Sequence, residues 1–238
     1  MPHSLLTDFP LYAQHTFESF IVTHSNRYAY HMAYIVADTD DVSMNGVPLL
    51  LCGSKGVGKS HLLQAIGNRI KRDSPNARLQ FWYCGNWIAD LCRAIRNEKE
   101  DDFFAACSQL DVLLIDGEDF DCIFRSMPEC KEKFLLMLSR LAKAGKRIAM
   151  TDSTIANESK YLKDYFFDNG QTVFINPLDF DIKTTILRHK INSLLPIFST
   201  NNLSKDLMDE FISDAAKQND KNIYELTELL MLAVRTAL

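Results

Sequence analysis

The chain has 238 residues, of which 47% are hydrophobic and 24% are charged, and its formal net charge is −5. This composition is typical of a soluble globular protein, and the chain has neither an apolar run long enough for a membrane span nor a secretory signal. The acidic balance argues against strong non-specific affinity for DNA, which needs a basic surface. The six cysteines form no Cys-x-x-Cys pair, so we expect reduced thiols, no cysteine-bound metal and a cytoplasmic location.

The chain begins with residues 1–16, which carry little periodic pattern and are predicted to form a tail or docking peptide. Strand-like apolar runs follow at 48–52, 79–84, 111–115, 147–151 and 172–175. Helical periodicity lies between these runs, at 59–72, 86–98, 128–144 and 156–166. Strands that alternate with helices predict an α/β fold, with a mostly parallel sheet covered by helices on both faces.

The last part of the chain has a different pattern. After Pro177 it is helical only, at 181–194, 204–218 and 222–237. We therefore expect an N-terminal tail at 1–16, an α/β domain at 17–178 and a small all-helical domain at 179–238.

The turn between the first strand and the following helix contains the pattern Gly-x-x-x-x-Gly-Lys-Ser, formed by Gly53, Gly58, Lys59 and Ser60. Glycines let the backbone fold around an anion, so that N–H groups and the helix N-terminus face the phosphates of a nucleotide. Lys59 is predicted to reach the β- and γ-phosphates, and the Ser60 hydroxyl to ligate Mg²⁺. The remaining predicted nucleotide contacts near this loop are Lys55, Gly56, Val57 and His61. The strand and helix on either side argue against a chance match.

A second signature is the acid that ends the strand-like run at 111–115, Asp116. In P-loop enzymes an acid at this place holds the water shell of Mg²⁺ beside the loop hydroxyl, so Ser60 and Asp116 are the predicted metal-site residues. Many ATPases place a second acid directly afterwards to orient the attacking water, but that position here is Gly117. Glu118, one residue further, is a catalytic candidate if the backbone bulges at Gly117.

The next strand-like run also ends in polar residues. Asp152 is a candidate sensor of the γ-phosphate or of the attacking water, and joins Asp116 and Glu118 as a catalytic candidate. The alternative is a helix N-cap, for which Thr151, Asp152 and Ser153 are all suitable. The sequence leaves both interpretations open.

Together these residues give a chain that resembles the AAA+ ATPase region of the bacterial DnaA family over residues 16–238. The similar segments are Thr16–Arg27 with a Phe-x-x-Phe motif, Pro48–Leu51, Ser60–Gly67, Asp111–Asp116, Pro177–Asp179, Thr185–Arg188 and Ile223–Leu230. The resemblance implies a P-loop AAA+ domain with a helical lid, which binds ADP or ATP with Mg²⁺ and acts in the initiation of chromosomal replication. It also implies that the Phe-x-x-Phe region lies over the adenine, which makes Phe20 and Val22 candidate nucleotide contacts.

The chain also departs from the family pattern. The family's C-terminal helix-turn-helix DNA-binding domain is not expected in this chain. The family's arginine finger falls at Phe166, the sensor arginine of the lid at Tyr224, and the second acid beside Mg²⁺ at Gly117. An arginine finger is worth ~10³–10⁵-fold in rate, and lysine replaces its planar guanidinium poorly. The resemblance thus implies a protein that binds nucleotide and hydrolyses it slowly.

A DnaA-like core without that DNA-binding domain resembles the Hda-like regulators, which couple inactivation of DnaA to the sliding clamp. Such regulators carry an N-terminal clamp-binding peptide, and Leu5–Tyr12 is similar but lacks the usual glutamine. The alternative is a segment that packs on its own domain. The expected partners are DnaA, the sliding clamp or the replicative helicase, with no membrane. The rival function is an active ATPase of the helicase-loader type that uses Glu118 as its catalytic acid.

One charged helix leaves a contact with single-stranded DNA open. Arg93, Arg96 and Lys99 lie three residues apart, a spacing that places them on one side of a helix. Acidic residues at 98 and 100–102 interrupt and follow them. A solvated face of mixed charge is therefore favoured over a weak DNA contact.

Overall fold

The computed structural model describes residues 6–117, 120–153, 160–194, 205–218 and 223–237. The chain divides into two compact units. The first consists of Met1–Ser54 and Gly58–Ile175, and the second of Lys55–Val57 and Asn176–Leu238. Each unit has its own hydrophobic core, and each is described by itself.

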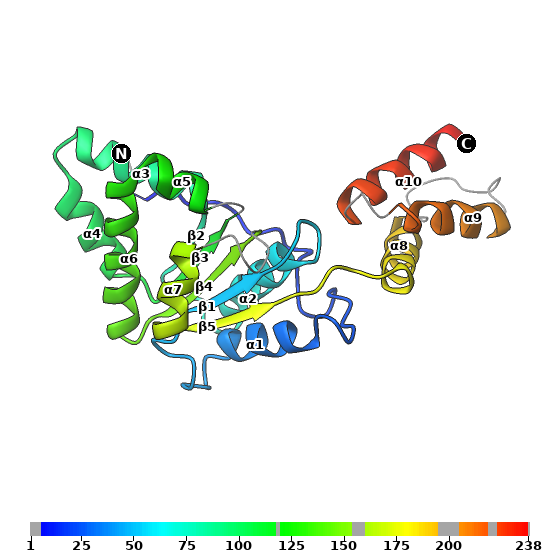
Figure 1. Ribbon diagram of the computed structural model, residues 1–238. Helices are drawn as coiled ribbons and strands as arrows, with labels where there is room; N and C mark the ends of the chain where they lie inside the picture. Colours follow the sequence, from blue (N-terminus) through cyan, green and yellow to red (C-terminus); the bar gives the residue numbers. More distant parts are fainter. Residues whose placement is uncertain (1–5, 118–119, 154–159, 195–204, 219–222, 238) are drawn as a thin grey trace. The chain divides into compact units, whose positions relative to one another are not determined.

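The first unit is built on a parallel sheet of five strands in the order β2-β3-β4-β1-β5 (Figure 1). The strands are β1 (Leu49–Cys52), β2 (Leu79–Tyr83), β3 (Val112–Asp116), β4 (Arg147–Asp152) and β5 (Gln171–Phe174). Strands β1 and β4 are buried along their whole length, as expected of near-continuous apolar runs in a sheet covered on both faces. The register pairs Cys52 with Asp152 and Leu51 with Thr151, which brings the carboxyl ends of β1 and β4 together.

Helices cover both faces of this sheet (Figure 1). On one face lie α1 (Arg27–Ala37) and α2 (Lys59–Asp73), which contact each other and the central strands. The other helices are α3 (Cys84–Arg96), α4 (Glu100–Ser108), α5 (Phe120–Ser126), α6 (Pro128–Lys143) and α7 (Lys160–Asn169). Of these, α3 contacts β2, α6 contacts β4 and α7 contacts β5, whereas α4 and α5 pack on neighbouring helices. The predicted α/β fold with a parallel sheet is confirmed, and α1, α4 and α5 add to the predicted elements.

The core beside α3, α5 and α6 is rich in aromatic rings. Phe120, Phe124 and Phe134 lie with ring centroids 5.5–5.7 Å apart, and Phe134 also meets Trp87 at 4.8 Å. All four side chains are at most 2% exposed. Each such ring contributes roughly 1.5–3 kcal/mol by leaving water, so this cluster holds α3, α5 and α6 together.

The second unit contains α8 (Phe180–Leu194), α9 (Lys205–Ala216) and α10 (Ile223–Ala237), which pack on one another. Its buried residues are Leu187, Ile191, Met208, Ile212, Ala215, Ala216 and Leu226. Arg188 on α8 and Asp209 on α9 add an ion pair at 2.8 Å on the surface. These helices match the predicted all-helical pattern. In the described part of the chain, no helix is both long and apolar enough to cross a membrane.

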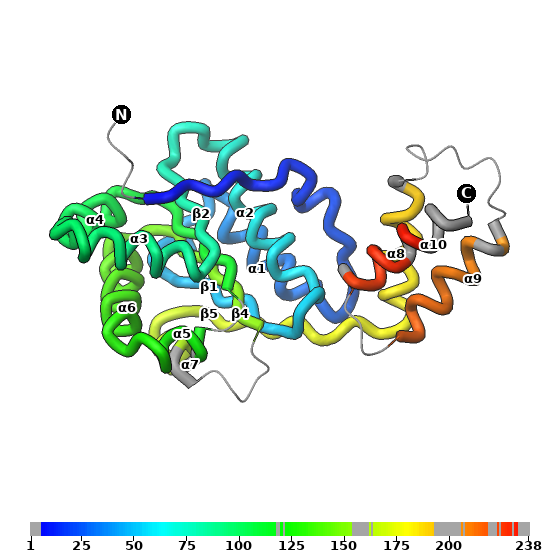
Figure 2. Tube along the Cα trace, turned by 90° about the horizontal axis from the view of Figure 1, so that it is seen from above, coloured from blue at the N-terminus to red at the C-terminus, as the bar shows by residue number. Residues whose placement is uncertain are grey.

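The described N-terminal residues, Leu6–Thr16, form neither helix nor strand and lie along the first unit as a strap (Figure 2). One end of the strap is held by the carboxylate of Asp90, which is 2% exposed. This carboxylate accepts hydrogen bonds from the Thr7 amide at 2.8 Å and from the Thr7 hydroxyl at 2.7 Å. The Gln80 side chain donates to the Thr7 carbonyl at 2.8 Å.

The other end of the strap is held by α2. The Tyr12 amide donates to the side-chain oxygen of Gln64 at 2.9 Å, and Asn68 donates to the carbonyls of Tyr12 and His15. Nearer the Thr7 end of the strap, Leu6 and Phe9 pack against the core. Residues Leu6–Tyr12 of the expected docking peptide therefore pack on their own domain, which is the alternative that the sequence left open for this segment. Residues 1–5 lie outside the described structure.

Candidate nucleotide site

The phosphate loop occupies the turn between β1 and α2. Gly56 and Gly58 have φ angles of 84° and 101°, in the left-handed region that favours glycine. Gly58 is also limited by space, because a Cβ there would lie 2.8 Å from Cε2 of Phe20. No side chain caps the N-terminus of α2, where the unsatisfied backbone N–H groups of a helix can meet an anion. The other loop residues are Lys55, which is exposed, and Val57, which is buried.

Lys59 is the first residue of α2 and is only 6% exposed. Its Nζ donates to the carbonyls of Gly53 at 2.7 Å and Ser54 at 2.9 Å. The ammonium group therefore lies against the loop's own backbone oxygens. Phosphate oxygens are stronger acceptors because they carry charge, so a bound nucleotide can replace these contacts.

Ser60 and Asp116, the predicted metal-site residues, are in contact. The Ser60 hydroxyl donates to Oδ1 of Asp116 at 3.0 Å, although the two residues are 56 positions apart in the chain. Asp116 is the last residue of β3, so the carboxyl end of this strand faces the start of α2. The structure thus brings together the hydroxyl and the carboxylate that the sequence assigned separately.

These two oxygen donors fit Mg²⁺. The ion prefers hard oxygen ligands, keeps several waters, and is usually held by one or two protein groups together with substrate phosphates. Among the described residues, no group of three or more His, Cys, Asp or Glu side chains forms a closed metal site. Ser60 and Asp116 would hold such an ion, with nucleotide phosphates as its further oxygen ligands.

Thr151 on β4 is a site residue that the sequence suggested only as a helix cap. Its hydroxyl donates to Oδ1 of Asp116 at 2.6 Å and accepts from the Gly117 amide at 2.9 Å. The same hydroxyl also lies 3.1 Å from the Gly117 carbonyl, but its one proton serves one acceptor at a time. Thr151 therefore fixes both the Asp116 carboxylate and the residue after it. Glu118 lies outside the described residues.

Asp152 ends β4 and is fully buried. Its carbonyl accepts from the Gly53 amide at 3.3 Å, and its β1 neighbour in the sheet is Cys52. Its backbone thus adjoins the start of the phosphate loop. The N-cap alternative for Thr151 and Asp152 is wrong, because both belong to β4 and the described helix α7 begins at Lys160.

Phe20 and His61 form one wall beside the loop. Their rings meet edge to face at 5.2 Å, and His61 also stacks on His15 at 4.7 Å. The His61 ring is fixed by contacts of Nε2 with the Thr16 carbonyl at 2.9 Å and the Ser19 hydroxyl at 3.2 Å. Val22, the other candidate base contact, is 44% exposed. The structure therefore brings Phe20 and His61 together, next to Gly58, and leaves Val22 on the surface.

Comparison with protein families gives a direct match: a model of the bacterial DnaA ATPase domain covers residues 11–169. The chain belongs to this family. The replication initiator DnaA of Paraburkholderia phymatum is 33% identical over 181 residues, which are 75% of this chain and 34% of that protein. The chain thus spans about a third of the length of this curated relative.

Solved structures of the same family share the fold. Domain III of the Thermotoga maritima replication initiation protein DnaA is 25% identical, with a TM-score of 0.78, and the match covers 96% of this chain and 91% of that chain. AMPPCP-bound DnaA from Aquifex aeolicus is 22% identical, with a TM-score of 0.76, and the match covers 96% of this chain and 67% of that one. The predicted membership in the DnaA-related AAA+ group is confirmed.

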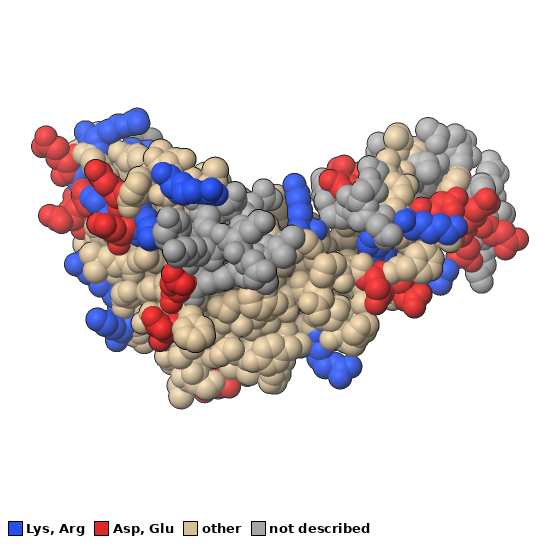
Figure 3. Space-filling view, in the orientation of Figure 1, with Lys and Arg blue, Asp and Glu red and all other residues tan. Residues whose placement is uncertain are grey.

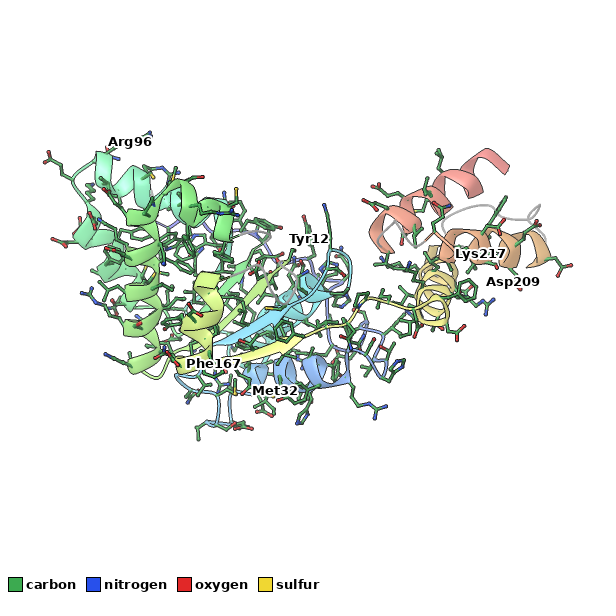
Figure 4. All side chains as sticks on the ribbon, viewed as in Figure 1. Tyr12, Met32, Arg96, Phe167, Asp209 and Lys217 are labelled. Atoms are coloured by element: carbon green, nitrogen blue, oxygen red, sulfur yellow. The ribbon has the colours of Figure 1, made fainter. Side chains whose placement is uncertain are left out.

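Phe166, which the resemblance placed at the arginine-finger position, is fully buried in this chain. Its neighbour Phe167 is 89% exposed and extends from the end of α7 (Figure 4). Position 166 is thus a core position here, which suits phenylalanine and would not present a guanidinium to a neighbour. The side chain of Tyr224, at the sensor position of the lid, lies outside the described residues.

The basic residues of α3 do not form a continuous basic strip. Arg93 on α3 donates to the Asp90 carboxylate of the same helix at 2.8 Å. On the adjoining helices, Lys133 of α6 pairs with Glu100 of α4. In the space-filling view, blue and red side chains mix at this end of the molecule (Figure 3). The face of mixed charge that the sequence favoured is the arrangement found, and it gives weak support to a DNA contact.

Two further residues were not recognised from the sequence, although each broke a local pattern. Gln64 is a polar residue in the apolar stripe of α2, and it is 2% exposed. Asp90 stands between apolar residues of α3 and is equally buried. A buried polar side chain needs partners, and the N-terminal strap supplies hydrogen-bond donors to both residues. Asp90 also accepts from Trp82 and Arg93.

Proposed function

We propose that this chain binds ADP or ATP with Mg²⁺ at Gly53–Ser60 and regulates the initiation of replication through protein contacts, with slow hydrolysis. The observation that carries the proposal is the contact between Ser60 and Asp116 beside Lys59. A lysine at the phosphates, a hydroxyl and a carboxylate at one Mg²⁺ form the set that P-loop NTPases use. The solved Aquifex DnaA holds AMPPCP, which supports a nucleotide at the equivalent loop.

The binding chemistry follows from the groups present. Backbone N–H groups of the loop and of the first turn of α2 meet the phosphate oxygens. Lys59 exchanges its two carbonyl contacts for the β- and γ-phosphates, and Ser60 and Asp116 orient Mg²⁺. Phe20 and His61 offer an aromatic wall for the base. Asp152 is proposed as a sensor near the γ-phosphate because β4 delivers it to the start of the loop.

Slow hydrolysis is supported by the residues at the family's reactive positions. Gly117 supplies no second acid, and Phe166 supplies no finger and is buried. Loss of an arginine finger alone lowers phosphoryl-transfer rates by ~10³–10⁵-fold. A chain that holds ATP without turning it over acts through contacts, which is the Hda-like role in the DnaA group.

The partner proposed for this role is a DnaA-family subunit or the replicative helicase. Docking on a sliding clamp through Leu5–Tyr12 is not part of the proposal, because Leu6, Thr7 and Phe9 are held by the first unit. A clamp would first have to detach the strap from Asp90 and Gln64.

The test is single-turnover hydrolysis of γ-labelled ATP by the purified protein, alone and with the DnaA of the same cell, alongside direct measurement of nucleotide affinity. We expect clear Mg²⁺-dependent binding of ADP and ATP and no turnover by the chain alone. Failure to bind either nucleotide would remove the proposal.

Turnover near ~1 s⁻¹, the lower range of typical enzymes, would instead favour the helicase-loader type of ATPase. In that case Glu118→Gln should abolish the activity, because Glu118 is the acid that this alternative requires. The matched variant Glu129→Gln, an exposed acid at the start of α6, should leave the activity unchanged.

A further inference from the structure

Four residues near the end of β3 define what we call the β3–α5 corner: Asp116, Gly117, Phe120 and Thr151. The Thr151 hydroxyl fixes Asp116 at 2.6 Å and the Gly117 amide at 2.9 Å. Asp116 therefore keeps its Mg²⁺ role while Gly117 is held against β4. Gly117 is also the position at which related ATPases carry their second acid.

There is no room for a side chain at position 117. A Cβ on Gly117 would lie 2.1 Å from Cε2 and 2.8 Å from Cζ of Phe120, and 2.8 Å from the backbone oxygen of Thr151. Non-bonded carbon atoms are most stable at about 3.5–4.0 Å, so all three contacts are repulsive. Even alanine would force a neighbour to move.

Neither neighbour can move easily. Phe120 is 1% exposed, and its ring packs against Phe124 at 5.7 Å and Phe134 at 5.6 Å between centroids. Because such cores are close-packed, a shift of this ring would disturb its packing with Phe124 and Phe134. The Thr151 oxygen belongs to the backbone of β4, which is paired with β1 and lies in a fully buried strand.

We propose that the β3–α5 corner sterically excludes a general base from position 117, so that the site holds the Mg²⁺ carboxylate without the acid that activates water. The inference rests on the proposed function and deepens it. Phe120 takes the space that the Cβ of an acid would need, so a single substitution at 117 does not restore hydrolysis. Bound ATP then persists until a partner supplies the missing groups or the nucleotide leaves.

The steric part is tested by thermal unfolding without nucleotide. Gly117→Ala is made in the wild type and in two backgrounds, Phe120→Ala and Phe124→Ala. Phe124 belongs to the same aromatic cluster, but its ring is not among the nearest atoms to the Cβ position of Gly117. We expect Gly117→Ala to lower the Tm by roughly 2–12 °C in the wild type and by a similar amount with Phe124→Ala.

In the Phe120→Ala background, the decrease in Tm caused by Gly117→Ala should be less than half of that in the wild type, because the closest clash is gone. An unchanged Tm for Gly117→Ala in the wild type, or an equal loss in the two phenylalanine backgrounds, would overturn the proposal. This cycle uses no nucleotide, so it decides about the corner even if the site binds none.

The chemical part is tested with Gly117→Glu, by single-turnover ATP hydrolysis and nucleotide affinity on one sample. The rate should rise by less than the ~10²–10⁴-fold that a positioned general base contributes. A rise of that size with Phe120 in place would show that the corner accepts the acid, and would overturn the proposal. If Gly117→Glu does not fold, the alanine cycle alone decides.

Discussion

The phosphate loop and the β3–α5 corner lie at the same carboxyl edge of the sheet but are held in opposite ways. In the loop, Lys59 is bound to the carbonyls of Gly53 and Ser54, which a charged ligand can displace. In the corner, Gly117 is enclosed by Phe120 and by the backbone of Thr151, which no ligand replaces. Polar contacts that can be exchanged suit binding, whereas apolar packing fixes one state. This difference is what the proposed function requires, namely a site that binds nucleotide and hydrolyses it slowly.

The largest expected effect is at the loop. Lys59→Ala should weaken ATP affinity by ~100-fold or more, because it removes a charge-assisted contact with two phosphates. Equilibrium binding of a fluorescent ATP analogue measures the loss. Lys71→Ala, at the exposed far end of α2, is the matched control and should keep the wild-type affinity. Unchanged affinity for Lys59→Ala would refute the assignment of the loop.

At the corner, Thr151→Val should cost about 1–3 kcal/mol in the free energy of unfolding. Valine keeps the shape of threonine but removes the acceptor of the buried Gly117 amide and one of the hydroxyl donors to Asp116, while Ser60 still donates to it. Urea unfolding measures the loss. Thr172→Val on β5 is the control, since it makes the same chemical change one strand beyond the site. If both variants lose equally, Thr151 has no special part in the corner.

A smaller effect distinguishes the metal from the phosphates. Ser60→Ala should weaken binding by about tenfold when Mg²⁺ is present and much less in excess chelator, because the hydroxyl serves the ion. Titration calorimetry with and without Mg²⁺ gives both values. A loss of the same size in both conditions would show that Ser60 acts on the phosphate directly.

The smallest expected effect is at the opposite end of β3. Arg78, and in addition Lys146, hold the pKa of Asp111 below its usual range. The ion pairs are partly exposed, so their contribution to stability is about 1 kcal/mol or less. It is fully present above the ordinary pKa of ~3.9 and is lost as the pH falls below it.

Asp111→Asn should therefore be slightly less stable than the wild type at pH 7, and the gap should close as the pH falls below about 4. Chemical unfolding at several pH values measures this. Nucleotide affinity should not change, because Asp111 lies at the amino end of the strand that Asp116 ends. A gap that widens in acid would reverse the assigned direction of the pKa shift.

The parts that sequence reasoning recovered are those with local signals. The strand, glycines, lysine and serine from Leu49 to Ser60 are contiguous, and Asp116 follows an apolar run of its own. The alternation of strands and helices was enough to predict the parallel sheet. In these segments the periodicity of the sequence and the observed strands and helices agree.

The parts that it missed depend on contacts between distant residues. The strap joins Thr7 to Asp90, 83 positions away, and its apolar residues read equally well as a docking tail. The closure of the corner depends on where Phe120 packs, which no local pattern specifies. Phe166 was placed at the arginine-finger position by resemblance alone. Its burial, beside the exposed Phe167, shows that its side chain lies on the core side of α7.

The strap also bears on how the chain is made. Thr7 is synthesised before the residue that holds it, because Asp90 comes 83 positions later in the chain. At roughly 5–20 residues per second, Thr7 waits about 4–17 s for that partner. Gln64 is available earlier, 52 positions after Tyr12. The strap can therefore attach first at Tyr12 and afterwards at Thr7.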